Sequence, residues 1–221
     1  MGVTVYYTKV SGGYLTYTKH CLDERVGRVE VTVDRMFTAE DLQKLTPQEI
    51  EDTMNRLLAH DDYIWNKQAQ VTFSGKRQMA KNLDTLLYRC PKCGAMYQME
   101  CSGNEMRCTA RGNTVALDEK YNLSPVGEGS VCPELVSDWV LLERKKAEED
   151  VKDSNFTYRG HVRVGRLPKY KNLKGDDTAV ICGEGELWLN RDGLHFSGTV
   201  DNEPYSMHLS TEQVPTFGMC T

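Results

Sequence analysis

Three cysteines have the spacing of a metal site. In CPKCG at 90–94, the two-residue spacer lets the thiolates of Cys90 and Cys93 face one ion, and the glycine frees the turn. CTARG at 108–112 repeats this frame with Arg111 in place of the second cysteine. Guanidinium stays protonated and cannot bind a metal. We therefore predict a three-thiolate site of Cys90, Cys93 and Cys108, whose cofactor is zinc, held weakly or already lost.

Cys101 is the alternative fourth ligand. Cys93 and Cys108 flank an expected hairpin whose tip lies near the turn-like residues Ser102 to Asn104. A strand rises about 3.3 Å per residue, which places Cys101 roughly 20 Å from the two knuckles. We therefore predict that Cys101 is not a ligand.

Short strands must hold these knuckles together. They are expected at 87–88, 96–100, 105–107 and 114–118, so residues 87–118 are predicted to form a zinc-ribbon-like module with one ligand missing. Its expected role is to staple a small lobe that has little core. Nucleic acid is not expected as a partner, because residues 76–120 carry only eight basic against five acidic residues.

A second candidate site is a basic strand near the C-terminus. The alternation of RGHVRV places Arg159, His161 and Arg163 on one face and valines on the other. An anionic membrane surface is the predicted partner, attracted by about 1 kcal/mol per basic residue. The alternative is an exposed sheet face over a valine core. Further basic residues follow this strand: Arg166, Lys169, Lys171 and Lys174.

No complete catalytic set is visible. None of the five histidines has a serine or cysteine nucleophile in a recognisable frame. The run His60-Asp61-Asp62 could do acid–base chemistry, but its position in an expected helix indicates a solvated helix surface. We predict no catalytic residue and no organic cofactor.

The surrounding pattern predicts an α+β fold in three parts. Residues 1–75 contain strands at 3–10 and 28–34, the second half-buried, and a helix of about five turns after the capping box at Thr46. The ribbon module spans 84–120, and residues 124–130 read as a linker. Residues 131–221 begin with a helix at 134–152 and continue as antiparallel strands, including a hairpin that turns at 190–193.

The bulk composition is that of an ordinary globular protein. The chain has 221 residues, 39% of them hydrophobic, and a formal charge of −5, which disfavours nucleic-acid binding by the whole chain. Eight cysteines without a secretory signal indicate a reducing, cytoplasmic setting. With the basic strand, this composition predicts a membrane-peripheral location.

The segments together resemble a known family. GGYLT at 12–16, RVEV at 28–31, FTAEDLQKLTPQEI at 37–50 and DDYIWNKQ at 61–68 resemble the region after the active site in bacterial 1-acyl-glycerol-3-phosphate acyltransferases. In a subset similar to those of Firmicutes, a ribbon like LYRCPKCGAMYQM at 87–99 follows, and then a β-rich tail like GELWLNRDGLHFSG at 185–198. The order of these motifs along the chain carries the resemblance.

The resemblance implies that residues 1–75 are the end of an α/β acyltransferase lobe. The family transfers an acyl group from a thioester to a lysophospholipid hydroxyl, with a histidine five positions before an aspartate as general base. The residues five positions after the histidines here are Arg25, Trp65, Arg166, Val200 and Gln213, so the motif is absent. The family's phosphate-binding motif is absent too. An acyl donor and a lysophospholipid are therefore expected only with a catalytic half that would precede Met1.

Two hypotheses follow from the sequence. In the first, the chain is the non-catalytic C-terminal part of a phospholipid-biosynthesis acyltransferase. In the second, it is a standalone ribbon-plus-β interaction module that binds a protein or an anionic lipid.

Overall fold

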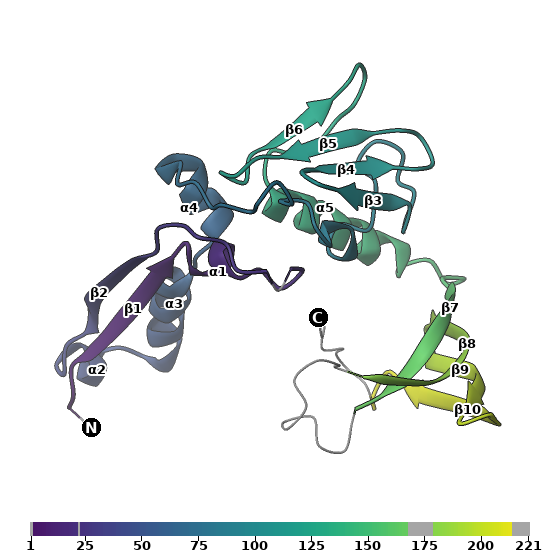
Figure 1. The fold of residues 1–221 in the computed structure, drawn as a ribbon. Helices are drawn as coiled ribbons and strands as arrows, with labels where there is room; N and C mark the ends of the chain where they lie inside the picture. Colours follow the sequence, from purple (N-terminus) through teal and green to yellow (C-terminus); the bar gives the residue numbers. More distant parts are fainter. Residues whose placement is uncertain (1, 22, 168–178, 214–221) are drawn as a thin grey trace. The chain divides into compact units, whose positions relative to one another are not determined.

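The fold is α+β, as predicted, with antiparallel sheets of two, four and four strands (Figure 1). The computed structural model describes residues 2–21, 23–167 and 179–213. The chain divides into two compact units, residues 1–144 and residues 145–220. The division falls within α5 (Val136–Asp150) rather than between the segments expected from the sequence.

The first unit begins with a hairpin. β1 (Val5–Ser11) pairs with β2 (Glu30–Phe37), and the one-turn helix α1 (Gly13–Thr16) follows β1. The expectation that the second strand is half-buried is wrong. Val31 and Val33 of β2 are 60% and 65% exposed, because a two-stranded sheet has few neighbours to cover its faces.

The predicted long helix is two helices. The short α2 (Asp41–Lys44) is followed by α3 (Pro47–Leu58), which starts at the predicted capping box of Thr46 and Glu49, and then by α4 (Asp62–Ala69). The break arises because the Asp61 side chain accepts the amides of Tyr63 and Ile64 and so begins a new helix. The solvated surface expected for this run is wrong for Asp62, which is buried.

The ribbon forms a four-stranded antiparallel sheet. After η1 (Leu83–Thr85), strands β3 (Met99–Ser102), β4 (Glu105–Cys108), β5 (Thr114–Leu117) and β6 (Leu123–Val126) pair in chain order. The predicted hairpin tip is confirmed, with Ser102 opposite Glu105. The linker expected at 124–130 is partly wrong, because its first residues form β6. Pro125 is tolerated there since β6 is an edge strand.

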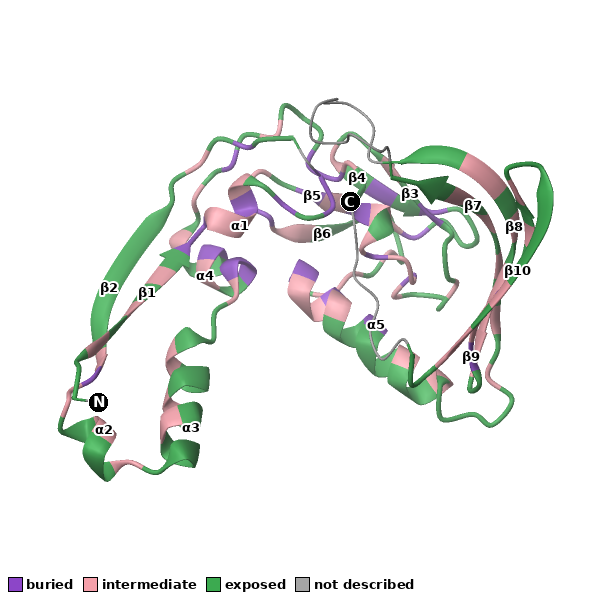
Figure 2. Ribbon diagram, turned by 90° about the horizontal axis from the view of Figure 1, so that it is seen from below, coloured by how far each residue is buried: buried purple, intermediate pink, exposed green. Residues whose placement is uncertain are grey.

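One hydrophobic core connects α1, α4, the ribbon sheet and α5, whereas α3 buries no residue (Figure 2). It joins Leu15 and Phe73 to the ribbon residues Met106 and Val115 and to Trp139 of α5. The N-terminal segments and the ribbon therefore share one core, although they were predicted from the sequence to be separate parts. Burial of large side chains is the main stabilising term for such a unit.

The second unit is a four-stranded sheet. β7 (Tyr158–Arg166), β8 (Val180–Asn190), β9 (Gly193–Val200) and β10 (Glu203–Ser210) are paired in sequence order. The predicted hairpin is confirmed, with Asn190 opposite Gly193. Gly185 and Gly198 face each other beside the buried Phe196 ring, where an added Cβ would approach the ring to 2.9 Å.

Within the described residues, none of the helices has both the length and the apolar composition that a membrane crossing requires.

Candidate metal centre

The two knuckles have the same backbone geometry. The amide of Gly94 donates to the Cys90 carbonyl over 2.9 Å, and the amide of Gly112 donates to the Cys108 carbonyl over 2.8 Å. Both glycines have left-handed φ, 72° and 69°, which is costly for residues with a side chain.

A second pair of bonds completes the match. The amide of Cys90 donates to the Ala95 carbonyl over 2.9 Å, and the amide of Cys108 donates to the Asn113 carbonyl over 2.8 Å. The second knuckle is therefore a knuckle in structure, and Arg111 stands where Cys93 stands in the first.

The predicted thiols converge. The sulfur atoms of Cys90, Cys93 and Cys108 all lie within 4.8 Å of one another, and the Cys93 and Cys108 sulfurs are 3.7 Å apart. Zinc–thiolate bonds of about 2.3 Å in a tetrahedral site place sulfurs about 3.8 Å apart. The three residues can therefore hold a metal ion.

The knuckles also control the charge of the thiols. The pKa of the exposed Cys93 thiol is lowered, first by the amide of Ala95, which donates to the sulfur, with a further contribution from the Arg111 charge. Burial raises the pKa of Cys90 to about 11. Arg111 thus stabilises the Cys93 thiolate, although its charge opposes a cation at the same site.

Helix α5 fixes the approach to the first knuckle. The Trp139 indole donates to the Arg89 carbonyl over 2.9 Å, and the amide of Arg89 donates to the Glu143 carboxylate over 2.7 Å. The two side chains are four residues apart, on one helix face. Sequence analysis did not predict these two contacts. The four-residue spacing of Trp139 and Glu143 in the expected helix could have placed both side chains on one face.

A buried asparagine fixes the second knuckle. The Asn113 side chain donates to the Val131 carbonyl over 3.0 Å and accepts the amide of Val131 over 2.8 Å. Asn113 follows Gly112 directly, so this exchange anchors the end of the knuckle to the segment before α5. No sequence signal distinguished this asparagine.

Cys101 lies outside the cluster, as predicted, but the predicted separation of roughly 20 Å from the knuckles was too large. Register places Cys101 opposite Met106, only two strand positions from the Met99–Cys108 pair, or about 7 Å along the strands. Its thiol instead contacts Asp84 and the backbone near Leu83, and burial raises its pKa to about 12. Cys101 is on the same sheet face as Cys108, so the two-position offset along the strands and the contact with Asp84 keep it outside the cluster.

The predicted basic face is mixed rather than purely basic. On β8, Trp188 lies opposite Arg159, Glu186 opposite His161 and Glu184 opposite Arg163. The His161 ring nitrogens lie 3.3 Å from Glu186 and 3.6 Å from Glu184. The Arg159 guanidinium lies over the Trp188 ring, 5.3 Å from its centre. The carboxylates offset much of the positive charge that the sequence suggested.

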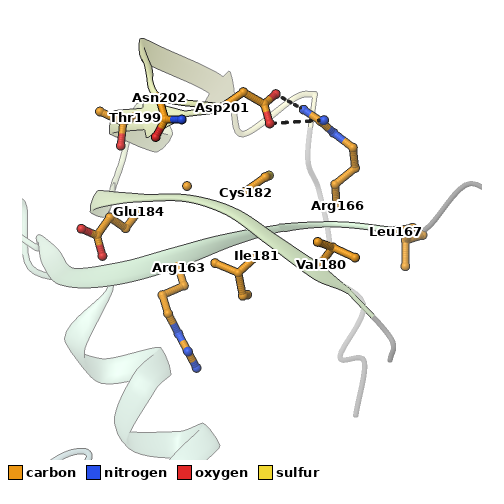
Figure 3. A pocket seen from close by; sticks show the side chains of 11 residues that line it. Arg163, Arg166, Leu167, Val180, Ile181, Cys182, Glu184, Thr199, Asp201 and Asn202 are labelled. Atoms are coloured by element: carbon orange, nitrogen blue, oxygen red, sulfur yellow. Dashed lines mark hydrogen bonds and ion pairs between the residues drawn. The ribbon is translucent and has the colours of Figure 1, made fainter. Parts of the chain in front are cut away.

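The later basic residues do not extend this face. A bulge between Val164 and Gly165 interrupts the alternation, and Arg166 pairs with Asp201 over 2.6 Å while Arg163 points away from that pair (Figure 3). Lys169, Lys171 and Lys174 lie outside the described residues.

Comparison of the chain with known protein families, curated proteins and solved structures gives no match.

Proposed function

We propose that Cys90, Cys93 and Cys108 hold a structural zinc ion that stabilises the first unit. The observation that carries this proposal is the convergence of three thiols between two knuckles of identical hydrogen bonding. Three thiolates leave the fourth position to water or a neighbouring group, so the ion is bound less tightly than by four. Its free energy of binding adds to the free energy of unfolding.

The test is elemental analysis of purified protein and two serine variants. The parent is expected to carry less than one zinc per chain. Cys108→Ser should abolish the zinc, whereas Cys101→Ser, the matched control on the neighbouring strand, should leave it unchanged. Loss of zinc in the Cys101 variant would contradict the assignment of ligands.

For the whole chain, we propose a role as the non-catalytic C-terminal part of a phospholipid-biosynthesis acyltransferase. The order of the segments from GGYLT to GELWLNRDGLHFSG supports this, together with the absence of His-x-x-x-x-Asp from all 221 residues. Without a general base, the lysophospholipid hydroxyl remains a poor nucleophile.

We therefore expect this chain alone to transfer no acyl group. The measurement is release of thiol from an acyl thioester in the presence of lysophosphatidate, compared with a buffer blank. Turnover that rises with the concentration of the chain would contradict the proposal.

A further inference from the structure

The cysteine cluster combines one accessible thiol with two buried ones. Cys93 is exposed, whereas Cys90 and Cys108 are buried. The sulfur atoms of Cys93 and Cys108 are 3.7 Å apart, so they need to approach by only about 1.7 Å to reach the length of a disulfide bond. A small reagent in solution can therefore reach one thiol that has a second thiol directly beside it.

The surroundings of Cys93 favour reaction at its sulfur. The Ala95 amide donates a hydrogen bond to the sulfur, and the positive charge of Arg111 acts on the same atom. An exposed cysteine among hydrogen-bond donors and positive charge is typically reactive, because the thiolate is the nucleophile. Cys101 on the same ribbon is the contrast, since it is partly buried and contacts the Asp84 carboxylate.

The two knuckles hold the sulfurs close together without help from an ion. The amide of Gly94 donates to the Cys90 carbonyl, and the amide of Gly112 donates to the Cys108 carbonyl, so backbone hydrogen bonds close each turn. The pairing of Cys108 with Met99 joins the second knuckle to the strand that follows the first. Groups held in contact in this way react as one molecule, which removes the entropy cost of bringing them together.

The arginine in the second knuckle keeps this thiol pair open to solvent. A structural zinc site with four thiolates is closed, because every coordination position is taken by a protein sulfur. With Arg111 in the fourth corner, a bound ion would have only three protein ligands, and Cys93 lies at the exposed side of the site. The residue that weakens metal binding therefore also leaves the cluster accessible to a small oxidant.

We propose that Cys93 and Cys108 are a reversible oxidation site, at which a hydroperoxide converts the two thiols into a disulfide. The Cys93 thiolate attacks one peroxide oxygen and the O–O bond breaks, which leaves a sulfenic acid on Cys93 and releases hydroxide. The Cys108 thiol then attacks the Cys93 sulfur, forms the S–S bond and displaces the sulfenic oxygen as water. The two thiols lose two electrons and two protons, which reduce one hydrogen peroxide to two waters.

Oxidation would also control the metal site. A disulfide removes two of the three thiolates, so a bound ion would be released. This consequence rests on the proposed zinc function, whereas disulfide formation needs only the thiols.

The test is peptide mapping of the full chain after treatment with hydrogen peroxide, with the metal first removed by a chelator. Trypsin separates the three cysteines of the cluster into peptides 90–92, 93–107 and 108–111. Cys101 shares the middle peptide with Cys93, so the mapping uses Cys101→Ser, which should form as much disulfide as the parent. Under non-reducing conditions, mass spectrometry should find peptide 93–107 linked to peptide 108–111, and dithiothreitol should separate them.

Two further substitutions in the Cys101→Ser chain test the role of each thiol. Cys108→Ser should lower the yield of linked peptide at least about tenfold and leave a sulfenic acid on Cys93 that dimedone captures. Cys93→Ser, at an exposed position, should lose both the link and the dimedone adduct in the cluster. Thermal unfolding checks that each variant is folded. A link between peptides 90–92 and 93–107 as the main product, or oxidation of Cys93 to a sulfinic acid without a link, would overturn the proposal.

A second measurement separates this proposal from that of the zinc site. In protein loaded with zinc, peroxide should release the ion in proportion to the disulfide formed, as measured with a chromogenic chelator. A chain that binds zinc but forms no disulfide, with or without the metal, would contradict the oxidation site alone. A chain that forms the disulfide but binds no zinc would contradict the zinc proposal alone.

Discussion

At the residue scale, Arg111 decides what the cysteine cluster can do. It occupies the fourth corner of a frame whose other corners are thiols, and it contributes a permanent positive charge there. In the metal-free protein that charge favours the Cys93 thiolate. The same charge would repel a cation bound by the three thiols, so Arg111 would weaken metal binding at this site.

Sequence analysis identified the three clustered cysteines because knuckle spacing is a local property. Two residues between cysteines and a glycine after them specify a turn, whatever surrounds it. It misjudged His60-Asp61-Asp62 because burial of Asp62 depends on the amides of Gly12 and Tyr14, about fifty residues away in the chain. No periodicity within α4 could show that contact.

At the scale of elements, the β7–β8 pair places basic side chains opposite carboxylates. Arg159, His161 and Arg163 were predicted as an anionic-surface site, and Glu184 and Glu186 lie across from two of them. Exposed charge pairs of this kind are weak and screened by salt. The attraction to an anionic membrane should therefore be limited by the carboxylates rather than by the number of basic residues.

We expect weak, salt-sensitive binding of the chain to vesicles that contain phosphatidylserine. Replacing Glu184 and Glu186 by glutamine should strengthen binding several-fold, because about 1 kcal/mol per restored basic charge is at stake. Replacing Arg159, His161 and Arg163 by alanine should reduce binding to these vesicles to the level that the parent chain shows with neutral vesicles. Co-sedimentation at low and high salt is the measurement, and equal binding by parent and alanine variant would mean that the face is only solvated surface.

Elements whose ends carry local signals were predicted well, and elements defined by their neighbours were not. The capping box of Thr46 and the turn at 190–193 are each specified by residues close together in the sequence. Strand β6 was missed because its segment is rich in glycine and proline and resembles a linker. It is a strand because it pairs with β5. Exposure of β2 likewise depends on what packs against a sheet rather than on its own alternation.

At the scale of the whole first unit, two buried groups give opposite pH dependence. Burial raises the pKa of Glu143 to about 7, against a lowering effect of the Arg89 charge, so the native state keeps a proton that the unfolded chain releases near pH 4.5. Stability from this group falls between pH 4.5 and 7. Burial, with the Arg25 charge, lowers the pKa of His20 to about 4, so its contribution rises between pH 4 and 6.5.

In the parent, the opposite pH dependences of stability from Glu143 and His20 nearly cancel. Replacing Glu143 should leave only the dependence that comes from His20. Glu143→Gln keeps an oxygen for the Arg89 amide but cannot titrate, so the free energy of unfolding should rise by roughly 2–3 kcal/mol from pH 4 to 6.5. The parent should change by less than about 1 kcal/mol over the same range. Urea unfolding of metal-free protein at four pH values measures this, and parallel profiles of parent and variant would contradict it.

Arg111→Cys tests most directly whether the second knuckle is a zinc knuckle with one ligand replaced. The substitution supplies a fourth thiolate and removes the opposing charge, so zinc measured by elemental analysis should rise to near one ion per chain. With free zinc at about a hundred times the dissociation constant, the gain in unfolding free energy is about 2.7 kcal/mol, visible as a higher melting temperature that a chelator abolishes. If the variant holds no more zinc than the parent and melts at the same temperature, residues 108–112 are not a metal knuckle.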